Sequence, residues 1–318
     1  MKKRDLLTLG SLSRDEIREI FHLAARLKKA QRGGKAHREL AGKTLAMVFE
    51  KPSLRTRVTF ETGMIQLGGQ AVFLGQGEVN LGVRESPADC ARSLSRWVDL
   101  IVVRSFSQAT VEEMARYATV PLINGLTDLF HPCQVLADLF TLTEHKGKLA
   151  GLKVAFVGDG NNMAHTWLQA AGKFPFSFYL ACPRGYGPRE EVVREAENSG
   201  GRVRVTHDVG EAVRNADVIY TDVWASMGQE GESEERRRTF RDYQVNRQVV
   251  SLARKDAVVM HCLPAHRDEE ITHEVLEGPR SIVFDQAENR LHLQKAVMVW
   301  ILKGTKGSRA KRVARRKR

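Results

Sequence analysis

Short apolar runs alternate with helix-patterned stretches along almost the whole chain. The apolar runs have the length of buried strands, and the stretches between them repeat apolar residues every three or four positions. Alternating strands and helices build parallel sheets with helices on both faces. We therefore expect an α/β protein with two doubly wound parallel-sheet domains.

The expected strands lie on both sides of the chain's midpoint. They are Thr44–Phe49, Gln70–Leu74, Leu100–Val103, Val120–Ile123, Lys153–Val157, Ser177–Ala181, Arg202–Thr206, Val218–Thr221, Ala257–His261 and Ile282–Phe284. The clearest helices between them are Leu54–Leu67, Pro132–Glu144, Met163–Lys173 and Glu190–Asn198. A further helix is expected before the first strand, because Ser13–Glu16 has the Ser-x-x-Glu form of a capping box.

The 318 residues suffice for two domains of roughly 150 residues each. We expect the division in the short stretch 145–152, which is rich in Lys and Gly. Residues 1–145 then form the first domain and residues 150–286 the second. An amphipathic helix over residues 287–303 is expected to pack back on the first domain.

The positive charge is concentrated at one end of the chain. Nine of the 50 Lys and Arg residues and no acidic residue fall in Lys303–Arg318, so the rest carries +3 of the total net charge of +12. We expect residues 305–318 to form a disordered, solvated basic tail. Binding of nucleic acid or an anionic surface is the alternative, although no aromatic residue interleaves these charges.

Cysteine spacing and hydropathy indicate the compartment. Cys90, Cys133, Cys182 and Cys262 form no CxxC pair, which argues against a disulfide framework or a thiolate metal site. The longest apolar run has seven residues, far below the roughly 20 that span a bilayer. No long apolar stretch follows the basic start, so we expect no secretory signal and a cytoplasmic protein.

The segment after the first strand has the features of an anion site. Ser53 stands at an expected helix N-cap, and Arg55, Thr56 and Arg57 fill the first turn. Free backbone N–H groups, the helix dipole, two hydroxyls and two guanidiniums then meet at one point. Arginines in a first turn oppose the helix dipole, so a purely structural capped helix gains nothing from them.

Later polar residues also fall at strand ends or helix starts. His131 precedes Pro132 at an expected helix start, and Gln134 can share its face, although this pair taken alone favours a structural cap. The turn Gly158–Met163 departs from GxGxxG, which disfavours a dinucleotide site, but its two asparagines could bind a polar zwitterion. Arg290 near the start of the last helix is by itself typical of a surface residue.

Two more strands end in polar segments. Asp222 opens the loop Asp222–Gly228, and the charged stretch up to Arg241 is expected to be a mobile loop, either a lid or plain solvated surface. Cys262 follows His261 at another strand end, and adjacent strand residues point to opposite faces, so His261 should not activate Cys262. A small buried cysteine is the alternative.

Taken in order, these motifs resemble those of the aspartate/ornithine carbamoyltransferase family, and of its ornithine carbamoyltransferases in particular. The matching segments are Ser-x-Arg-Thr-Arg, His-Pro-x-Gln, Asp-x-Trp-x-Ser-Met-Gly and His-Cys-Leu-Pro, within a likeness that runs from about Arg4 to Gly304. The last two segments point to ornithine rather than aspartate.

The resemblance implies transfer of the carbamoyl group of carbamoyl phosphate to Nδ of L-ornithine, giving L-citrulline and phosphate in arginine metabolism. It implies no metal and no organic cofactor, and a homotrimer or multiple of trimers with shared sites. The residues it assigns to carbamoyl phosphate are Ser53, Leu54, Arg55, Thr56, Arg57, Asn80, Arg104, His131, Gln134, Cys262, Leu263 and Arg290. The residues it assigns to ornithine are Asn162, Asp222, Ser226 and Met227. The catalytic residues among these are Arg104, His131, Asp222, Cys262 and Arg290.

Two positions depart from the family pattern. Leu54 stands where the family often has Thr, and Asn80 is one methylene shorter than the usual Gln of the loop that reaches a neighbouring subunit. Either Asn80 or Arg84 is therefore expected to complete that neighbour's site. The anabolic or catabolic direction and the assembly beyond a trimer stay open.

Three other functions compete with this interpretation. A sibling transcarbamylase could use putrescine, an acylated ornithine or aspartate, but the Ser-Met-Gly loop opposes it. A nucleotide-dependent oxidoreductase is opposed by the missing GxGxxG pattern. Nucleic-acid binding is supported only by the tail, and deletion of Lys306–Arg318 with a salt-dependent binding assay tests it.

Overall fold

The computed structural model describes residues 4–226 and 228–303, and the chain divides into two compact units. The first contains the described residues up to Asp128 and from Arg290 onward, and the second is Leu129–Asn289. Each unit has one parallel sheet with helices on both faces, which confirms the predicted fold class. By these contacts helix α6 (Pro132–Lys146) lies in the second unit, whereas the division expected after residue 145 put it in the first.

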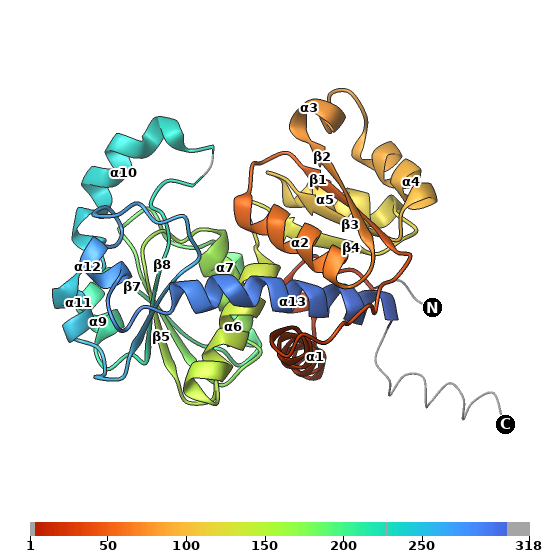
Figure 1. The fold of residues 1–318 in the computed structure, drawn as a ribbon. Coiled ribbons are helices and arrows are strands. Elements are labelled where there is room, and N and C mark those ends of the chain that lie inside the picture. Colours follow the sequence, from red (N-terminus) through yellow and green to blue (C-terminus); the bar gives the residue numbers. More distant parts are fainter. Residues whose placement is uncertain (1–3, 227, 304–318) are drawn as a thin grey trace. The chain divides into compact units, whose positions relative to one another are not determined.

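The first unit is built on a sheet of four parallel strands in the order β2-β1-β3-β4. Its strands are β1 (Thr44–Phe49), β2 (Gln70–Gly75), β3 (Leu100–Arg104) and β4 (Leu122–Leu126) (Figure 1). Its helices are η1 (Leu9–Ser11), α1 (Arg14–Arg32), α2 (Leu54–Gln66), α3 (Gln76–Val79), α4 (Pro87–Trp97) and α5 (Gln108–Tyr117). The Ser13–Glu16 capping box predicted at the start of α1 is confirmed, because both of its reciprocal hydrogen bonds are present.

One face of this sheet packs on α4 and α5, because alternate strand residues are apolar and point the same way. The buried cluster on this face includes Ala46, Val48, Ala91, Leu94, Ile101, Val103, Val111 and Met114. Fully buried strands such as β3 read as continuous apolar runs, as expected for parallel sheets covered on both faces. This continuity made the strands easy to predict.

The last helix, α13 (Val283–Lys303), is anchored in the first unit by a buried lysine. Nζ of Lys295 lies 2.5 Å from Oε1 of Gln31, 2.8 Å from Oε1 of Gln66 and 3.1 Å from Nε2 of His37. Burial lowers the pKa of Lys295 to about 8. A Cβ at Gly63 of α2 would lie only 3.0 Å from the Lys295 side chain, so this glycine permits close helix packing. The predicted return of the C-terminal helix is confirmed.

The second unit has five parallel strands in the order β7-β6-β5-β8-β9. They are β5 (Lys153–Val157), β6 (Ser177–Ala181), β7 (Arg202–Thr206), β8 (Val218–Thr221) and β9 (Val258–His261). Its helices besides α6 are α7 (Asn162–Ala171), α8 (Glu190–Asn198), α9 (Val209–Val213), η2 (Glu230–Glu232), α10 (Ser233–Phe240), η3 (Arg241–Tyr243), α11 (Arg247–Ser251) and α12 (His273–Leu276).

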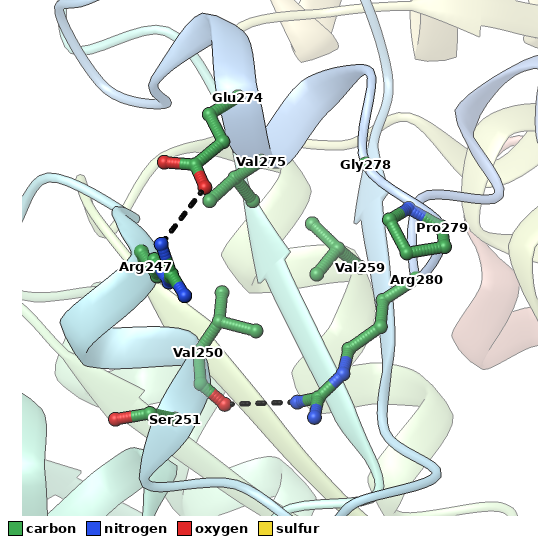
Figure 2. Close-up of a pocket in the computed structure, with 9 residues that line it drawn as sticks. All are labelled: Arg247, Val250, Ser251, Val259, Glu274, Val275, Gly278, Pro279 and Arg280. Atoms are coloured by element: carbon green, nitrogen blue, oxygen red, sulfur yellow. Dashed lines mark hydrogen bonds and ion pairs between the residues drawn. The ribbon is translucent and has the colours of Figure 1, made fainter.

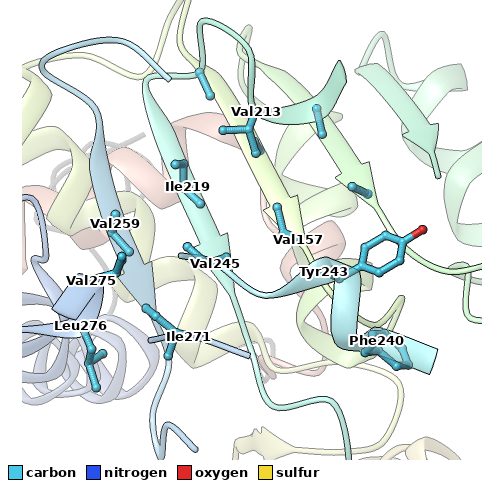
Figure 3. Close-up of a cluster of buried hydrophobic side chains, with 14 of the residues drawn as sticks. Val157, Val213, Ile219, Phe240, Tyr243, Val245, Val259, Ile271, Val275 and Leu276 are labelled. Atoms are coloured by element: carbon cyan, nitrogen blue, oxygen red, sulfur yellow. The ribbon is translucent and has the colours of Figure 1, made fainter. Parts of the chain in front are cut away.

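The two faces of this second sheet have different cores. On one face Trp167 of α7 stacks on Phe178 at 6.2 Å between ring centroids and meets Tyr220 edge-on at 5.5 Å. The other face packs against α9, α12 and the segment after α10. Figure 3 shows this second cluster, whose labelled members are Val157, Val213, Ile219, Phe240, Tyr243, Val245, Val259, Ile271, Val275 and Leu276.

Two strand predictions need correction. The expected strand Ile282–Phe284 is the start of α13, which begins at Val283, one turn earlier than predicted. Only Ser281 makes a bridge to Val259 there, and the chain then turns into the helix. The expected strand Val120–Ile123 is shifted to Leu122–Leu126, because Pro121 has no N–H to contribute to a strand.

The stretch expected to be a mobile loop up to Arg241 contains helix α10 instead. Phe240 is fully buried and lies 4.8 Å from the Tyr186 ring and 6.0 Å from the Trp224 ring. One aromatic side chain therefore anchors one end of a helix whose other residues are nearly all polar. Such a helix carries almost no hydrophobic periodicity, which is why the sequence pattern missed it.

Candidate functional site

The first group of predicted site residues lies where β1 runs into α2. Ser53 is the N-cap of α2, and its hydroxyl accepts a hydrogen bond from the Thr56 backbone N–H at 3.1 Å. The Ser-x-Arg-Thr-Arg segment thus fills the first turn, where backbone N–H groups and the helix dipole favour an anion. The buried Thr56 hydroxyl accepts a hydrogen bond from Nη2 of Arg290 at 3.0 Å. The structure therefore brings Arg290 to this motif.

Two residues of the same segment face other surroundings. The guanidinium of Arg57 lies 3.7 Å from the centroid of the Phe73 ring and 3.6 Å from the Glu61 carboxylate. The Leu54 side chain is 73% exposed. Its backbone N–H is part of the first helical turn, so a backbone contact to an anion is the one role this position retains.

Arg104 ends β3 at the same edge of the first sheet. It is buried, with 3% of its surface exposed, and its neighbour in the register with β1 is Phe49. Its partner in β4 is Leu126, while Val103 pairs with Asn124, so the register passes over Gly125. A β-bulge of this kind redirects the side chains beside it. The irregularity therefore sits opposite a buried arginine at the carboxyl edge, where α/β proteins bind ligands.

Asn80 and Arg84 lie in an exposed segment after β2. Asn80 is the C-cap of α3 and has a φ of 47°, in the left-handed region that Asn tolerates. The Arg84 guanidinium donates to the Glu78 carbonyl at 3.4 Å. Both side chains are exposed on the first unit.

The second group of site residues lies in the second unit and starts at α6. His131 is the N-cap of this helix, which confirms the predicted start. Nε2 of Gln134 donates to Oδ1 of Asp138 at 2.8 Å, and the Tyr220 hydroxyl donates to Oδ2 at 2.9 Å. Burial beside Asp138 raises the pKa of Tyr220 well above its usual value, so its hydroxyl remains a donor. An ionised carboxylate only accepts, so Asp138 orients the Gln134 amide.

The ends of β8 and β9 bring an acid and a thiol together. Thr221 pairs with His261 in the register, so the residues that follow, Asp222 and Cys262, leave the sheet side by side. Sγ of Cys262 donates to Oδ1 of Asp222 at 3.0 Å. Nδ2 of Asn161 donates to Oδ2 at 2.8 Å. The carboxylate is thereby held by donors from two neighbouring strand ends.

His261 has a different role from its neighbour Cys262. Its Nδ1 accepts the Leu263 backbone N–H at 2.8 Å, so Nε2 carries the proton and donates to Oε1 of Glu270 at 2.9 Å. Both His261 and Glu270 are fully buried. Leu263 has a φ of 57°, an uncommon conformation for a residue with a branched side chain. His261 therefore holds the Leu263 backbone rather than activating the thiol, as its strand position predicts.

The remaining predicted ornithine residues follow β5 and β8. Asn162 is the first residue of α7, and its carbonyl accepts from the Thr166 hydroxyl at 2.7 Å. The Ser226 backbone N–H donates to the Gln229 side chain at 3.0 Å. Met227 lies outside the described residues.

Helix α10 is tied to the same edge of the second sheet. Nη1 of the buried Arg236 donates to Oδ2 of Asp159 at 3.0 Å and to the Trp224 carbonyl at 2.8 Å. Nε of Arg236 donates to Glu232 at 2.9 Å. Burial raises the pKa of Asp159 to about 6, although the ion pair with Arg236 opposes this. The segment expected to be a mobile loop thus contains a helix that is held beside the loop beginning at Asp222.

His165 supports the entry to α6 in its neutral form. Its Nδ1 lies 3.2 Å from the Leu129 carbonyl, and its Nε2 accepts the Arg189 backbone N–H at 3.0 Å. Since Nε2 accepts, a second proton on the ring would face another donor. Burial accordingly lowers the pKa of His165 to about 4.

Acid is expected to destabilise the second unit through His165. A folded pKa of about 4 against 6.5 unfolded means that stability is lost as the pH falls below 6.5. Between pH 7.5 and 5 the loss is about 2 kcal/mol from this residue. Urea unfolding followed by tryptophan fluorescence at both pH values should show this dependence shrink by that amount in His165→Gln. The exposed His22→Gln is the control, and an unchanged dependence in His165→Gln contradicts the prediction.

A cavity of about 270 Å³ in the second unit lies apart from these residues. Figure 2 shows its lining, with the Arg247–Glu274 ion pair at 3.7 Å and the hydrogen bond from Arg280 to the Val250 carbonyl at 3.1 Å. The complete lining is Arg247, Val250, Ser251, Val259, Glu274, Val275, Gly278, Pro279 and Arg280. None of the predicted site residues belongs to it.

Sequence reasoning missed the residues that orient the site. Asn161 holds Asp222 and also caps α7, and Asp138 holds Gln134. The signal for Asn161 was its place directly before a helix, which predicts an N-cap but not a contact to another strand. Asp138 had only the weak signal of an acid on an otherwise apolar helix face.

Family models match both parts of the chain. The model described as "Aspartate/ornithine carbamoyltransferase, carbamoyl-P binding domain" matches residues 4–144, and the "Asp/Orn binding domain" of the same name matches residues 150–301. The ornithine carbamoyltransferase of Anoxybacillus flavithermus is 54% identical over 306 residues, which cover 95% of this chain and 98% of the relative.

Relatives from Pyrococcus furiosus agree in sequence and in structure. The anabolic ornithine carbamoyltransferase of Pyrococcus furiosus is 52% identical over 307 residues, covering 95% of this chain and 98% of the relative. A solved structure of ornithine carbamoyltransferase from P. furiosus superimposes with a TM-score of 0.92 at 52% identity, covering 96% of this chain and 98% of that one.

The fold and site define an α/β protein with a capped helix start suited to an anion in one unit and a paired acid and thiol in the other. The chain belongs to the aspartate/ornithine carbamoyltransferase family. The resemblance carried by its motifs is thereby confirmed. Among residues 4–226 and 228–303, no helix is both long and apolar enough to cross a membrane.

Proposed function

We propose that this protein transfers the carbamoyl group of carbamoyl phosphate to Nδ of L-ornithine, giving L-citrulline and phosphate. The observation that carries the proposal is the Asp222–Cys262 contact at the ends of β8 and β9, with Asn161 holding the same carboxylate. A fixed carboxylate recognises a cationic amino acid. Near-full-length relatives at 54% and 52% identity bear the name ornithine carbamoyltransferase.

The first unit is proposed to hold the phosphate and the carbamoyl oxygen. The α2 start around Ser53 and Thr56 supplies N–H groups and hydroxyls, and Arg55 adds charge. Arg104 and Arg290 act on the carbamoyl group, whose oxygen gains negative charge as the amine attacks. Fixed donors cost little reorganisation at that moment, so they lower the barrier.

The second unit is proposed to orient the nucleophile and the carbamoyl amide. The ornithine Nδ must be neutral to attack, although its pKa in water is about 10.4 by analogy with lysine. Asp222 attracts the cationic amino acid, and Asp222 and Cys262 accept hydrogen bonds from its side-chain amine. Asn162 and Ser226 hold the rest of the amino acid. His131 and Gln134 bind the carbamoyl group. Its carbon forms the bond to Nδ as its bond to the phosphate oxygen breaks, and the proton that Nδ loses leaves with the phosphate.

A ureido-product assay with carbamoyl phosphate and a panel of amines tests this function. The panel contains ornithine, putrescine, N-acetylornithine, lysine and aspartate. Turnover with ornithine alone is the expected result. Turnover with another amine retains carbamoyl transfer and rejects the ornithine assignment, and no turnover with any amine rejects both.

We also propose a homotrimer or a multiple of trimers in the cytoplasm, acting in arginine metabolism. Large apolar side chains exposed on the described residues are concentrated in the first unit, which holds eight of the ten, including Trp97 and Val83 at 72% and 80% exposed. Exposed apolar surface of this kind favours a subunit interface. Light scattering at assay concentration tests the assembly, and a fully active monomer would contradict it.

Replacing Arg84 with alanine is expected to raise the KM for carbamoyl phosphate by at least about tenfold, because hydrogen bonds to charged groups are worth 1.5–3 kcal/mol. The exposed guanidinium is proposed to act in a neighbouring copy's site. Arg92→Ala, an exposed arginine paired with Asp89, is the matched control. If the KM is unchanged in Arg84→Ala, the role passes to Asn80, and Asn80→Ala becomes the variant to measure.

A further inference from the structure

One buried amide in the first unit has no role in the function proposed above. Gln294 of α13 is fully buried and lies four residues after Arg290, on the same helix face. It stands between Arg290 and Thr59 of α2, both in the first unit. Burying an amide is costly unless its donor and acceptor are both used. Its contacts therefore identify what it does.

The hydroxyl of Thr59 decides which way this amide faces. Its Oγ1 donates to the Arg55 carbonyl at 2.5 Å, as a hydroxyl commonly does one turn back in a helix. With its proton used there, Oγ1 accepts from the Gln294 amide. Nε2 of Gln294 therefore faces Thr59, and Oε1 faces Arg290. In this orientation both ends of the amide are satisfied.

Gln294 then holds one side of the Arg290 guanidinium by hydrogen bonds. Oε1 of Gln294 accepts from Nη2 at 2.9 Å and from Nε at 3.3 Å. Nη2 also donates to the Thr56 hydroxyl at 3.0 Å. The result is a chain of hydrogen bonds, here called the relay, that runs from Arg290 through Gln294 and Thr59 to the Arg55 carbonyl. It ties the guanidinium to the turn of α2 that carries the Ser-x-Arg-Thr-Arg segment.

We propose that Gln294 is a positioning residue that aims Arg290 while leaving its positive charge undiminished. The inference rests on the proposed carbamoyl transfer and deepens it. Arginine pairs most strongly with a carboxylate, which would also neutralise its charge. A neutral amide gives two hydrogen bonds without that loss. The guanidinium charge, which Gln294 does not neutralise, then serves an anionic substrate and the oxygen that becomes negative in the transition state.

Two substitutions of Gln294 separate the orientation of the Arg290 guanidinium from its charge. Gln294→Leu removes the hydrogen bonds that hold Arg290. It is expected to lower kcat about tenfold, with little change in the KM for carbamoyl phosphate, because misplacement of a catalytic group lowers the rate. Gln294→Glu keeps two acceptors for Arg290 but neutralises it. It is expected to raise both the KM and the dissociation constant for carbamoyl phosphate about tenfold.

The matched control is Gln66→Leu. This glutamine also joins α2 to α13, through Lys295 at 2.8 Å, and it does not take part in the relay to Arg290. A merely structural role for Gln294 predicts that both leucine variants lower the melting temperature while kcat and KM stay at wild-type values. That result overturns the inference. Thr59→Val should reproduce the kcat loss of Gln294→Leu, because it removes the acceptor that orients the amide.

A separate readout distinguishes failure of this inference from failure of the proposed function. Isothermal titration with carbamoyl phosphate alone, without any amine, reports binding independently of turnover. If the wild type transfers to no amine but binds carbamoyl phosphate, weaker binding by Gln294→Glu supports the inference and unchanged binding overturns it. If the wild type neither transfers nor binds, the proposed function fails and the inference fails with it.

Discussion

Replacing Arg104 with methionine is expected to lower kcat for carbamoyl transfer by about two to three orders of magnitude, the usual cost of losing one donor to a developing oxyanion. Arg104 ends the central strand β3, is 3% exposed and faces a bulge in β4. A charge buried at the end of a strand, at the edge where ligands bind, is placed for chemistry rather than for solubility. Methionine keeps much of the side-chain length without the donors.

The measurement is kcat and KM for both substrates, with circular dichroism to establish that the variant folds. Arg104→Lys is the informative companion, because a single ammonium lacks the planar fork of a guanidinium and should recover only part of the rate. Arg92 of the same unit, which is exposed and pairs with Asp89, supplies a control as Arg92→Met. A kcat within about threefold of wild type in Arg104→Met contradicts the role.

The second large effect is expected at Asp222. Asp222→Asn should raise the KM for ornithine by about 10- to 100-fold, since a hydrogen bond to a charged partner contributes 1.5–3 kcal/mol. The weaker binding of ornithine has two causes. The charge that attracts the cationic amine is gone, and the new amide can turn its NH₂ toward Nδ2 of Asn161, where it has a donor instead of an acceptor.

Steady-state kinetics with each substrate varied in turn locates this effect. The KM for ornithine should rise far more than the KM for carbamoyl phosphate. Asp242→Asn removes the same charge from an exposed position of the second unit and should leave both values unchanged. Equal increases for both substrates in Asp222→Asn would assign Asp222 to the fold of the strand ends rather than to amine recognition.

The strands and helices were largely predictable because a parallel sheet covered on both faces needs continuous apolar strands. β1, β5, β6 and β8 have the bounds that their apolar runs predict. Helix α10 was missed because it is held by Phe240 and Arg236, two buried side chains in a charged segment. The segment Ile282–Phe284 was taken for a strand because a short apolar triplet does not distinguish a strand from a helix start.

The candidate site was predictable as far as local chemistry reaches. Ser53 at a helix start and polar residues after strands can be identified without neighbours, because caps and strand ends depend on adjacent residues. The hydrogen bonds by which Gln294 holds Arg290 could not be predicted. Thr59 and Gln294 are 235 residues apart, and nothing in either segment indicates the other.

The sequence by itself determined the order of strands and helices, the polar residues at their ends and, through its motifs, the family. These depend on period, composition and near neighbours along the chain. Only the tertiary structure decided how those residues are held: Asp138 turns the Gln134 amide, Asn161 fixes the Asp222 carboxylate and Gln294 aims Arg290. Hydrogen bonds have direction as well as distance. Hydrogen bonds between segments far apart in the sequence take their geometry only once each unit has packed.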